Sequence, residues 1–168
     1  MEKIKVGVIG AGSISQEHIR SYLNNPGVEL YALCDINEKT LKNAGEKYGV
    51  TRLFTDKDKM LAALPELDAV SVCTWNSAHA PCAIAALNAG CHVLCEKPVA
   101  LSLADLDAME QCCNENGITF TVHQQRRFDQ DFRIAKKVFD TGTLGRMYTV
   151  KSMLYGFNGN MHDWHVYK

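Results

Sequence analysis

The sequence of 168 residues has no excess of charge of either sign. It contains 18 Lys and Arg residues against 19 Asp and Glu residues, a formal net charge of -1. Binding to nucleic-acid phosphates needs a broad basic surface, and binding to an anionic membrane needs a polybasic patch. The composition therefore argues against a nucleic-acid or membrane partner. It is compatible only with a local basic patch.

Long apolar runs are also absent. No run approaches the roughly 20 residues that a helix needs to cross a bilayer. The first three residues lead into a short run rich in Val and Ile, which is not the pattern of a signal peptide. We therefore expect a cytoplasmic protein. The 46% hydrophobic and 22% charged content is typical of a globular chain.

The seven cysteines form an odd set and contain no C-x-x-C pair, so neither a disulfide framework nor a cysteine zinc site is expected. Cys34, Cys73, Cys91 and Cys95 fall in or beside apolar runs. Reduced cysteines in such runs behave as small buried hydrophobic residues. A reactive thiol is the alternative.

Short apolar runs alternate regularly with segments of helical period. We expect strands over 4–9, 28–34, 52–54, 69–74, 92–95 and 119–122. We expect helices over 13–23, 37–48, 56–64, 78–89 and about 102–117. Strands that are apolar throughout and alternate with helices predict a parallel sheet covered on both faces. The sequence thus predicts a doubly wound α/β domain of the Rossmann type over about residues 1–122.

The pattern changes beyond residue 122. We expect one helix over 129–140, a turn over 142–145, and a long strand over 147–157, which together begin a second, α+β domain over 123–168. A lone strand cannot satisfy its own backbone hydrogen bonds, so its partners must come from outside this sequence. Either the chain is a fragment, or another copy supplies those partners and the protein is a homo-oligomer.

A glycine-rich turn follows the first predicted strand and opens the first helix: Gly10, Ala11, Gly12, Ser13, Ile14. Glycine at 10 permits a tight turn, and glycine at 12 lets the backbone approach a pyrophosphate held by the N–H groups of the helix. The third position of this dinucleotide fingerprint holds Ser15, where Gly or Ala is usual. The alternative is an ordinary structural turn.

Asp35 stands at the end of the second predicted strand, 23 positions after Gly12. A carboxylate there can accept the ribose hydroxyls of an adenosine and would repel a 2′-phosphate, so we expect NAD to be preferred over NADP. Ile36 and Asn37 add no positive charge that would favour a phosphate. The alternative is that Asp35 only caps the following helix.

The triplet Glu96, Lys97, Pro98 follows the fifth predicted strand, at the carboxyl edge of the sheet where open α/β folds bind ligands. Oxidation of an alcohol by a nicotinamide needs a base for the hydroxyl proton. Lys97 is the candidate for that base. The alternative is a surface lysine in a turn set by Pro98.

Taken together, these features resemble the glucose-fructose oxidoreductase and inositol dehydrogenase family (Gfo/Idh/MocA). The resemblance adds the Thr74, Trp75, Asn76 and His79 stretch after the fourth strand and the run from Gln125 to Phe128. It implies NAD(P)-dependent hydride transfer to or from a sugar, inositol or related polyol. It also implies that Lys97 is the proton donor and acceptor and that the peptide bond between Lys97 and Pro98 is cis.

The resemblance further implies which residues surround the cofactor. We expect these to be Gly10, Gly12, Ser13, Ile14, Asp35, Ile36, Thr74, Trp75, Asn76, His79, Glu96, Lys97 and Gln125. No resident metal is expected. The non-catalytic alternative is a nucleotide-binding or sensing protein, and a narrower one is NAD-dependent glycoside cleavage.

The sequence departs from the family pattern in three ways. Trp75 replaces a proline, and Gln125 replaces an asparagine. Family members are also about twice as long, and their second domain supplies an Asp and a His that act with the lysine. We therefore expect this chain to bind cofactor but to lack those two residues. The His162, Asp163 and His165 stretch could suggest a metal site, but it has no further ligands.

Overall fold

The computed structural model describes residues 2–153. By its internal contacts the chain divides into two compact units, Met1–His123 and Gln124–Lys168. The two units are described separately below. No helix among the described residues is long and apolar enough to cross a membrane.

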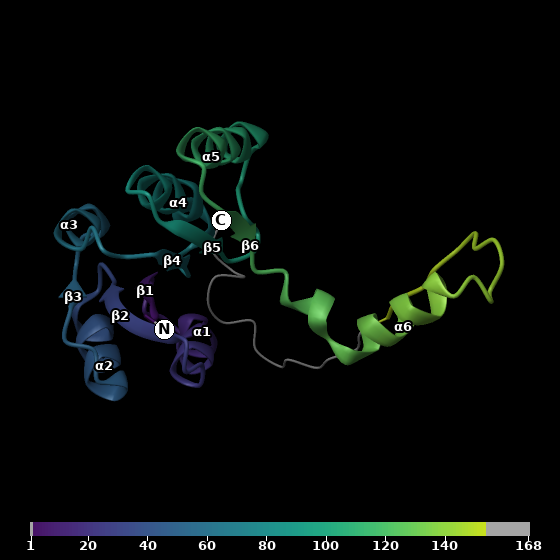
Figure 1. The fold of residues 1–168 in the computed structure, drawn as a ribbon, viewed down its shortest axis with the longest axis horizontal. Helices are drawn as coiled ribbons and strands as arrows, with labels where there is room; N and C mark the ends of the chain where they lie inside the picture. The colour runs from purple at the N-terminus through teal and green to yellow at the C-terminus, as the bar shows by residue number, and fades with distance from the viewer. Residues whose placement is uncertain (1, 154–168) are drawn as a thin grey trace. The chain divides into compact units, whose positions relative to one another are not determined.

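The first unit is built on a six-stranded sheet in which every neighbouring pair of strands is parallel. Its strands are β1 (Ile4–Ile9), β2 (Val28–Cys34), β3 (Leu53–Phe54), β4 (Ala69–Val72), β5 (His92–Cys95) and β6 (Phe120–Val122). Their order is β3-β2-β1-β4-β5-β6 (Figure 1). The order reverses direction between β1 and β4, and ligands of such sheets bind at that point, beyond the carboxyl ends of the strands.

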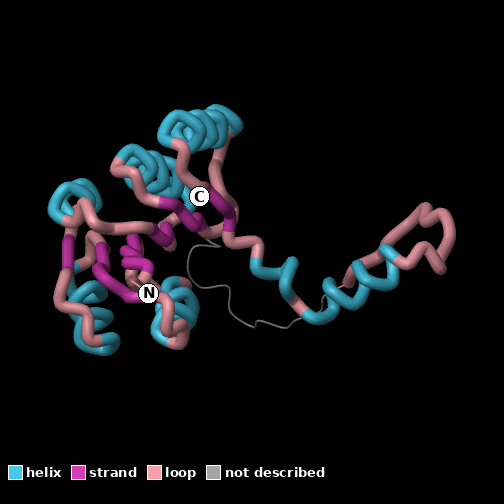
Figure 2. The backbone as a smooth tube through the Cα atoms, viewed as in Figure 1, coloured by secondary structure: helices cyan, strands magenta, loops and turns pink. Residues whose placement is uncertain are grey.

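Helices cover the two faces of this sheet, as Figures 1 and 2 show. They are α1 (Ser15–Leu23), α2 (Glu38–Tyr48), α3 (Lys57–Ala63), α4 (His79–Asn88) and α5 (Leu103–Asn116). Helices α1 and α2 lie on one face, and α3, α4 and α5 lie on the other. A short 3-10 turn, η1 (Asn76–Ala78), precedes α4. The doubly wound α/β fold expected from the sequence is confirmed.

Local sequence signals explain where these helices begin and end. The Asn37 side chain accepts the N–H of Thr40 at the start of α2, and the Ser102 hydroxyl accepts the N–H of Asp105 at the start of α5. Such bonds satisfy N–H groups that have no partner within the helix. Gly49 and Gly117 end α2 and α5 in the left-handed conformation, which glycine adopts without strain.

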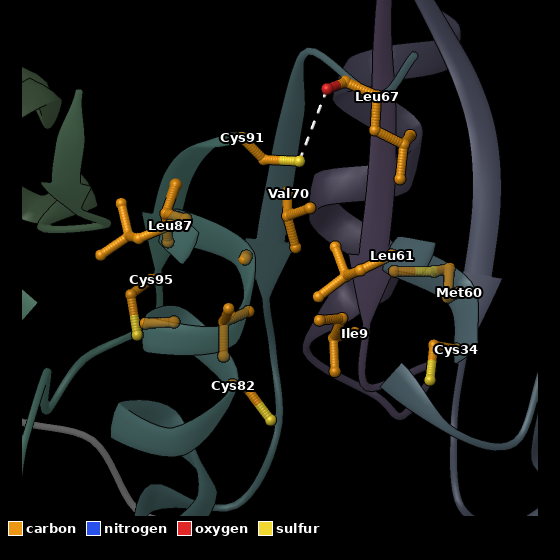
Figure 3. Close-up of a cluster of buried hydrophobic side chains, with 14 of the residues drawn as sticks. Ile9, Cys34, Met60, Leu61, Leu67, Val70, Cys82, Leu87, Cys91 and Cys95 are labelled. Atoms are coloured by element: carbon orange, nitrogen blue, oxygen red, sulfur yellow. Dashed lines mark hydrogen bonds between the residues drawn. The ribbon is translucent and has the colours of Figure 1, made fainter. Parts of the chain in front are cut away.

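Six of the seven cysteines are buried, and all seven are free thiols. Figure 3 shows Cys34, Cys82 and Cys95 among the apolar side chains of the larger core, with the Cys91 Sγ directed at the carbonyl oxygen of Leu67, 3.4 Å away. Burial raises the pKa of the Cys34 and Cys95 thiols to about 12 and that of Cys91 to about 11. These residues therefore pack as small hydrophobic groups, as the sequence predicted.

The second unit contains a 3-10 turn, η2 (Gln125–Phe128), and the helix α6 (Gln130–Asp140). The expected turn over 142–145 follows, and its residues Gly142 and Gly145 both have positive φ. The prediction of a strand over 147–157 is wrong for residues 147–153, which form no strand. An isolated strand has no neighbour for its backbone groups, and nothing in the described part of the unit pairs with this segment. Residues 154–157 and the His162, Asp163 and His165 stretch lie outside the described residues.

Candidate cofactor and acid-base site

The glycine turn begins where β1 meets the end of β4. Gly10 has a φ of +95°, and a Cβ built on it would lie 2.5 Å from the carbonyl oxygen of Cys73. Its N–H donates to the carbonyl oxygen of Cys34 at the end of β2. No larger residue fits between these backbones, so a glycine is required at this position.

Gly12, unlike Gly10, is not crowded by neighbouring backbone atoms. A Cβ at Gly12 would meet no atom within 4 Å, so the backbone is open on that side. The buried Ser15 hydroxyl donates to the Gly12 carbonyl oxygen at 2.8 Å, which shows how serine serves at the third fingerprint position. No side chain caps the start of α1, where Ile14 holds the N-cap position. An uncapped helix start beside an open glycine backbone fits the pyrophosphate of a dinucleotide.

Asp35 joins the end of β2 to the glycine turn. Its Oδ2 accepts the Ala11 N–H at 2.7 Å, and its Oδ1 accepts the Asn37 N–H at 2.8 Å. Each carboxylate oxygen has room for two hydrogen bonds, so acceptor capacity is left for a ligand. Asn37 caps α2, so Asp35 is not the capping residue. Ile36 beside it is 88% exposed.

The loop after β4 carries Thr74, Trp75 and Asn76, and His79 begins α4. The His79 side chain is buried, with Nδ1 2.7 Å from the Pro98 carbonyl oxygen and Nε2 3.1 Å from the Thr74 carbonyl oxygen. The imidazole thereby joins the loop after β4 to the loop after β5. Trp75 is 55% exposed.

Glu96 follows β5 and lies in a buried polar cluster. Its Oε1 is 2.8 Å from His18 Nε2 and 2.7 Å from His123 Nδ1, and its Oε2 accepts the Lys97 N–H at 3.1 Å. Burial raises the pKa of this carboxyl group, but the hydrogen bonds from His18, His123 and the Lys97 backbone outweigh it and lower the pKa to about 2. Glu96 is therefore a carboxylate at neutral pH. The bond between Lys97 and Pro98 is cis, as the resemblance implied.

The contacts of His18 and His123 with Glu96 were not predicted from the sequence. A signal was nevertheless present, because Glu96 and His123 each directly follow a strand, and the carboxyl ends of neighbouring parallel strands meet at one edge of the sheet. His18 lies in the first turns of the helix that the glycine turn opens. Its contact with Glu96 brings the Glu96, Lys97, Pro98 triplet beside that helix.

The remaining residue expected at the site, Gln125, belongs to the second unit, in η2. Its side-chain Oε1 is buried and has no hydrogen-bond partner among the described residues. All the other expected residues belong to the first unit. They lie in the segments that follow the carboxyl ends of β1, β2, β4 and β5, with His79 at the first position of α4.

A family model described as an oxidoreductase family with an NAD-binding Rossmann fold (GFO_IDH_MocA) matches residues 4–124. The chain belongs to this family. The match contains the glycine turn, Asp35 and the Glu96, Lys97, Pro98 triplet. The resemblance inferred from the sequence is thus confirmed.

Similar proteins in this family include dehydrogenases of inositols. The chain is 33% identical to myo-inositol 2-dehydrogenase of Thermotoga maritima over 148 residues, which are 88% of this chain and 44% of that protein. The structure of scyllo-inositol dehydrogenase from Lactobacillus casei, with bound NAD(H) and scyllo-inositol, matches with a TM-score of 0.80 at 29% identity, over 86% of this chain and 43% of that one. An NAD-binding protein from Listeria innocua matches with a TM-score of 0.87 at 32% identity, over 98% and 48%. The chain thus spans less than half the length of these relatives.

Proposed function

We propose that this chain provides the cofactor domain and the acid-base lysine of an NAD-preferring dehydrogenase that acts on an inositol, sugar or related polyol. The observation that carries the proposal is the 2.8 Å contact between His18 and Glu96. It brings the residue next to Lys97 against the helix whose start fits the cofactor pyrophosphate. Lys97 is thereby held close to where a dinucleotide would lie.

The geometry around Asp35 supports the preference for NAD. The carboxylate lies next to the glycine turn, where it can accept ribose hydroxyls and would repel a 2′-phosphate. The adjacent Ile36 and the Trp75 side chain after β4 present exposed apolar surface at the same edge of the sheet. Apolar surface of this kind suits the flat rings of a dinucleotide.

His79 and Glu96 act indirectly in this proposal. Their polar atoms face partners within the protein, and both side chains are almost fully buried. We assign them to shaping the loops after β4 and β5 rather than to touching the cofactor. Gly10, Gly12, Ser13, Ile14, Asp35, Ile36, Thr74, Trp75, Asn76 and Gln125 keep their proposed cofactor roles.

Lys97 performs the proton transfer of the proposed reaction. In the oxidation direction, the Lys97 Nζ takes the proton from the substrate hydroxyl as the C–H bond of the same carbon breaks. Bound NAD supplies the acceptor for the hydride. In the reverse direction, Lys97 returns the proton to the oxygen of the carbonyl group. The names of the relatives support a polyol substrate, and we infer that the rest of the substrate pocket comes from sequence that this chain does not contain.

The test uses the full-length protein with NAD and a panel of myo-inositol, scyllo-inositol and D-apiose, following NADH absorbance. Lys97→Ala is compared with Lys39→Ala, an exposed lysine on α2. We expect turnover with at least one polyol. We expect Lys97→Ala to lower kcat by roughly 100-fold or more, the usual size of a general acid-base contribution, while NADH binding is kept. Cofactor binding without turnover of any substrate would instead favour a sensing protein.

A further inference from the structure

We propose that His18 and His123 are positioning residues that fix the Glu96 carboxylate, and that Glu96 in turn fixes the backbone of Lys97. This inference rests on the proposed role of Lys97. It adds two histidines to the set of residues expected at the site, and it explains why a charged glutamate is buried next to the lysine.

Three separate elements supply the members of this cluster. His18 comes from α1, Glu96 follows β5, and His123 follows β6. The backbone N–H of His123 donates to the Cys95 carbonyl oxygen at 2.7 Å. This bond continues the pairing of β6 with β5 and holds His123 next to Glu96. The ring centroids of His18 and His123 are 4.3 Å apart. The cluster therefore connects α1, the helix that follows the glycine turn, with the carboxyl ends of β5 and β6.

The burial of Glu96 makes its partners necessary. Glu96 is 3% exposed and His18 is 4% exposed. A buried carboxylate is costly unless hydrogen bonds or an opposite charge replace the water it has lost. Two imidazole N–H groups meet Oε1, and the Lys97 N–H meets Oε2. Without the histidines, the carboxylate would have to move toward water and would leave the Lys97 N–H.

The hydrogen-bonding roles also fix the tautomers. A carboxylate only accepts hydrogen bonds, so His18 must carry a proton on Nε2 and His123 must carry one on Nδ1. A side-chain amide can place an N–H donor at about the same distance from the backbone as each of these imidazole nitrogens. Gln extends its N–H₂ to about the position of a histidine Nε2, and Asn extends it to about that of Nδ1.

One ligand atom from each of His18, Glu96 and His123 lies within 4.8 Å of the other two, so these side chains also form a set that a divalent metal could use. The distances favour hydrogen bonding. Two ligands at about 2.1 Å from a tetrahedral ion stand roughly 3.4 Å apart, whereas the two N–O distances here are 2.8 and 2.7 Å. Zn²⁺ binding therefore becomes an outcome of the test that would overturn the proposal.

The experiment compares two kinds of substitution in the full-length protein. His18→Gln and His123→Asn keep an N–H donor but cannot titrate, while His18→Leu and His123→Leu remove the donor. His92→Asn is the matched control, because His92 lies at the amino end of β5 and its Nδ1 accepts the Thr119 N–H, which an Asn oxygen can also do. The readouts are hydrogen exchange of the peptide covering residues 96–99, kcat and KM with the polyol, and the Kd of NADH.

We expect the Leu variants to speed exchange in this peptide by about tenfold or more, the effect of losing a hydrogen bond to a charged group. We expect kcat to fall by a similar factor while KM and the Kd of NADH change by less than about threefold. The amide variants should restore both exchange and kcat, and His92→Asn should match the wild type. This restoration keeps the test valid even if a Leu variant folds poorly.

Two results would overturn the proposal. One is unchanged exchange and kcat in both Leu variants. The other is a combined result. The amide variants would show the same faster exchange and lower kcat as the Leu variants, and calorimetry would detect Zn²⁺ binding to the wild type but not to the amide variants. Failure of the proposed function is seen separately: if Lys97→Ala keeps normal kcat, the role of Lys97 is wrong, whereas the exchange data still report whether the cluster holds its backbone.

Discussion

The backbone N–H of Ala11 in the glycine turn donates to the Oδ2 of Asp35 over 2.7 Å. Two turns from different strands are therefore held together by the carboxylate that is proposed to bind the ribose. The second oxygen accepts the Asn37 N–H. Asp35 thus shapes the turn and also keeps free acceptor capacity on its exposed side.

This double role predicts two effects of Asp35→Ala. We expect the Kd of NADH to rise at least about tenfold, because hydrogen bonds to a charged acceptor are lost. We expect the preference over NADPH to narrow, because the repulsion of a 2′-phosphate is also lost. Calorimetric titration measures both. Asp107→Ala, an exposed site on α5, is the control, and equal NADH affinities in the two variants would contradict the assignment.

Gly10 predicts a steric effect that can be separated from backbone strain. Gly10→Ala places a Cβ 2.5 Å from the Cys73 carbonyl oxygen, whereas a Cβ at Gly49, also at positive φ, would meet no atom within 4 Å. We expect Gly49→Ala to destabilise the fold by about 1 kcal/mol and Gly10→Ala by at least about 1 kcal/mol more. Urea unfolding measures the difference. Equal losses would mean that the close approach at Gly10 is relieved at little cost.

The lowered pKa of Glu96 predicts a stability that depends on pH. A carboxyl group whose pKa is about 2 in the folded state, against an ordinary value of 4.5, stabilises the fold above pH 4.5 and loses this contribution as the pH falls toward 2. The facing groups are His18 and His123, and burial keeps the Cys73 and Cys95 thiols neutral by raising their pKa.

Glu96→Gln removes this titration. We expect the stability difference between the wild type and Glu96→Gln to shrink by about 2 kcal/mol between about pH 5 and about pH 3. In that range the Glu96 carboxyl group takes up a proton in the unfolded wild type but not in the folded one, and a Gln side chain takes up none in either state. Urea unfolding at each pH gives the difference. A difference that is constant over this range would show that Glu96 has no lowered pKa.

Burial of the thiols predicts slow alkylation of the native protein. Cys113 is the one cysteine that is not fully buried. We expect iodoacetamide near neutral pH to modify Cys113 first and to reach the other six only when the fold opens, because the thiolate is the reactive form and burial raises the pKa of buried thiols. Mass spectrometry after alkylation with and without urea counts the modified sites. Rapid native modification of Cys34 or Cys95 would contradict the core packing.

Much of the fold could be predicted from the sequence, because local signals and tertiary packing agree. The apolar runs of β1 and β2 must be buried on both faces, and Asn37 and Ser102 mark helix starts by chemistry that acts over a few residues. The glycine turn and Asp35 follow from the same alternation, since they stand directly after strands. The strand expected over 147–157 is absent over residues 147–153, because a strand-like pattern forms a strand only when a neighbouring strand is present.

The cluster around Glu96 could not be predicted in detail. His18 and Glu96 are 78 positions apart, and their contact depends on how α1 packs against the sheet, which no local pattern encodes. The two contacts of the His79 imidazole likewise depend on the folded structure, because they require the carbonyl oxygens of Pro98 and Thr74 to lie on either side of the ring. The sequence predicted that Glu96 and His79 follow strands at the carboxyl edge of the sheet, but no local pattern indicated which partners their side chains contact.

The proposed cofactor site is tested most directly by calorimetric titration of the protein with NADH and, separately, with NADPH. It tests the cofactor site without requiring a substrate. We expect saturable binding of one NADH per chain, and we expect NADPH to bind at least about tenfold more weakly because Asp35 repels the 2′-phosphate. Binding of neither nucleotide to the full-length protein, or tighter binding of NADPH, would contradict this proposal.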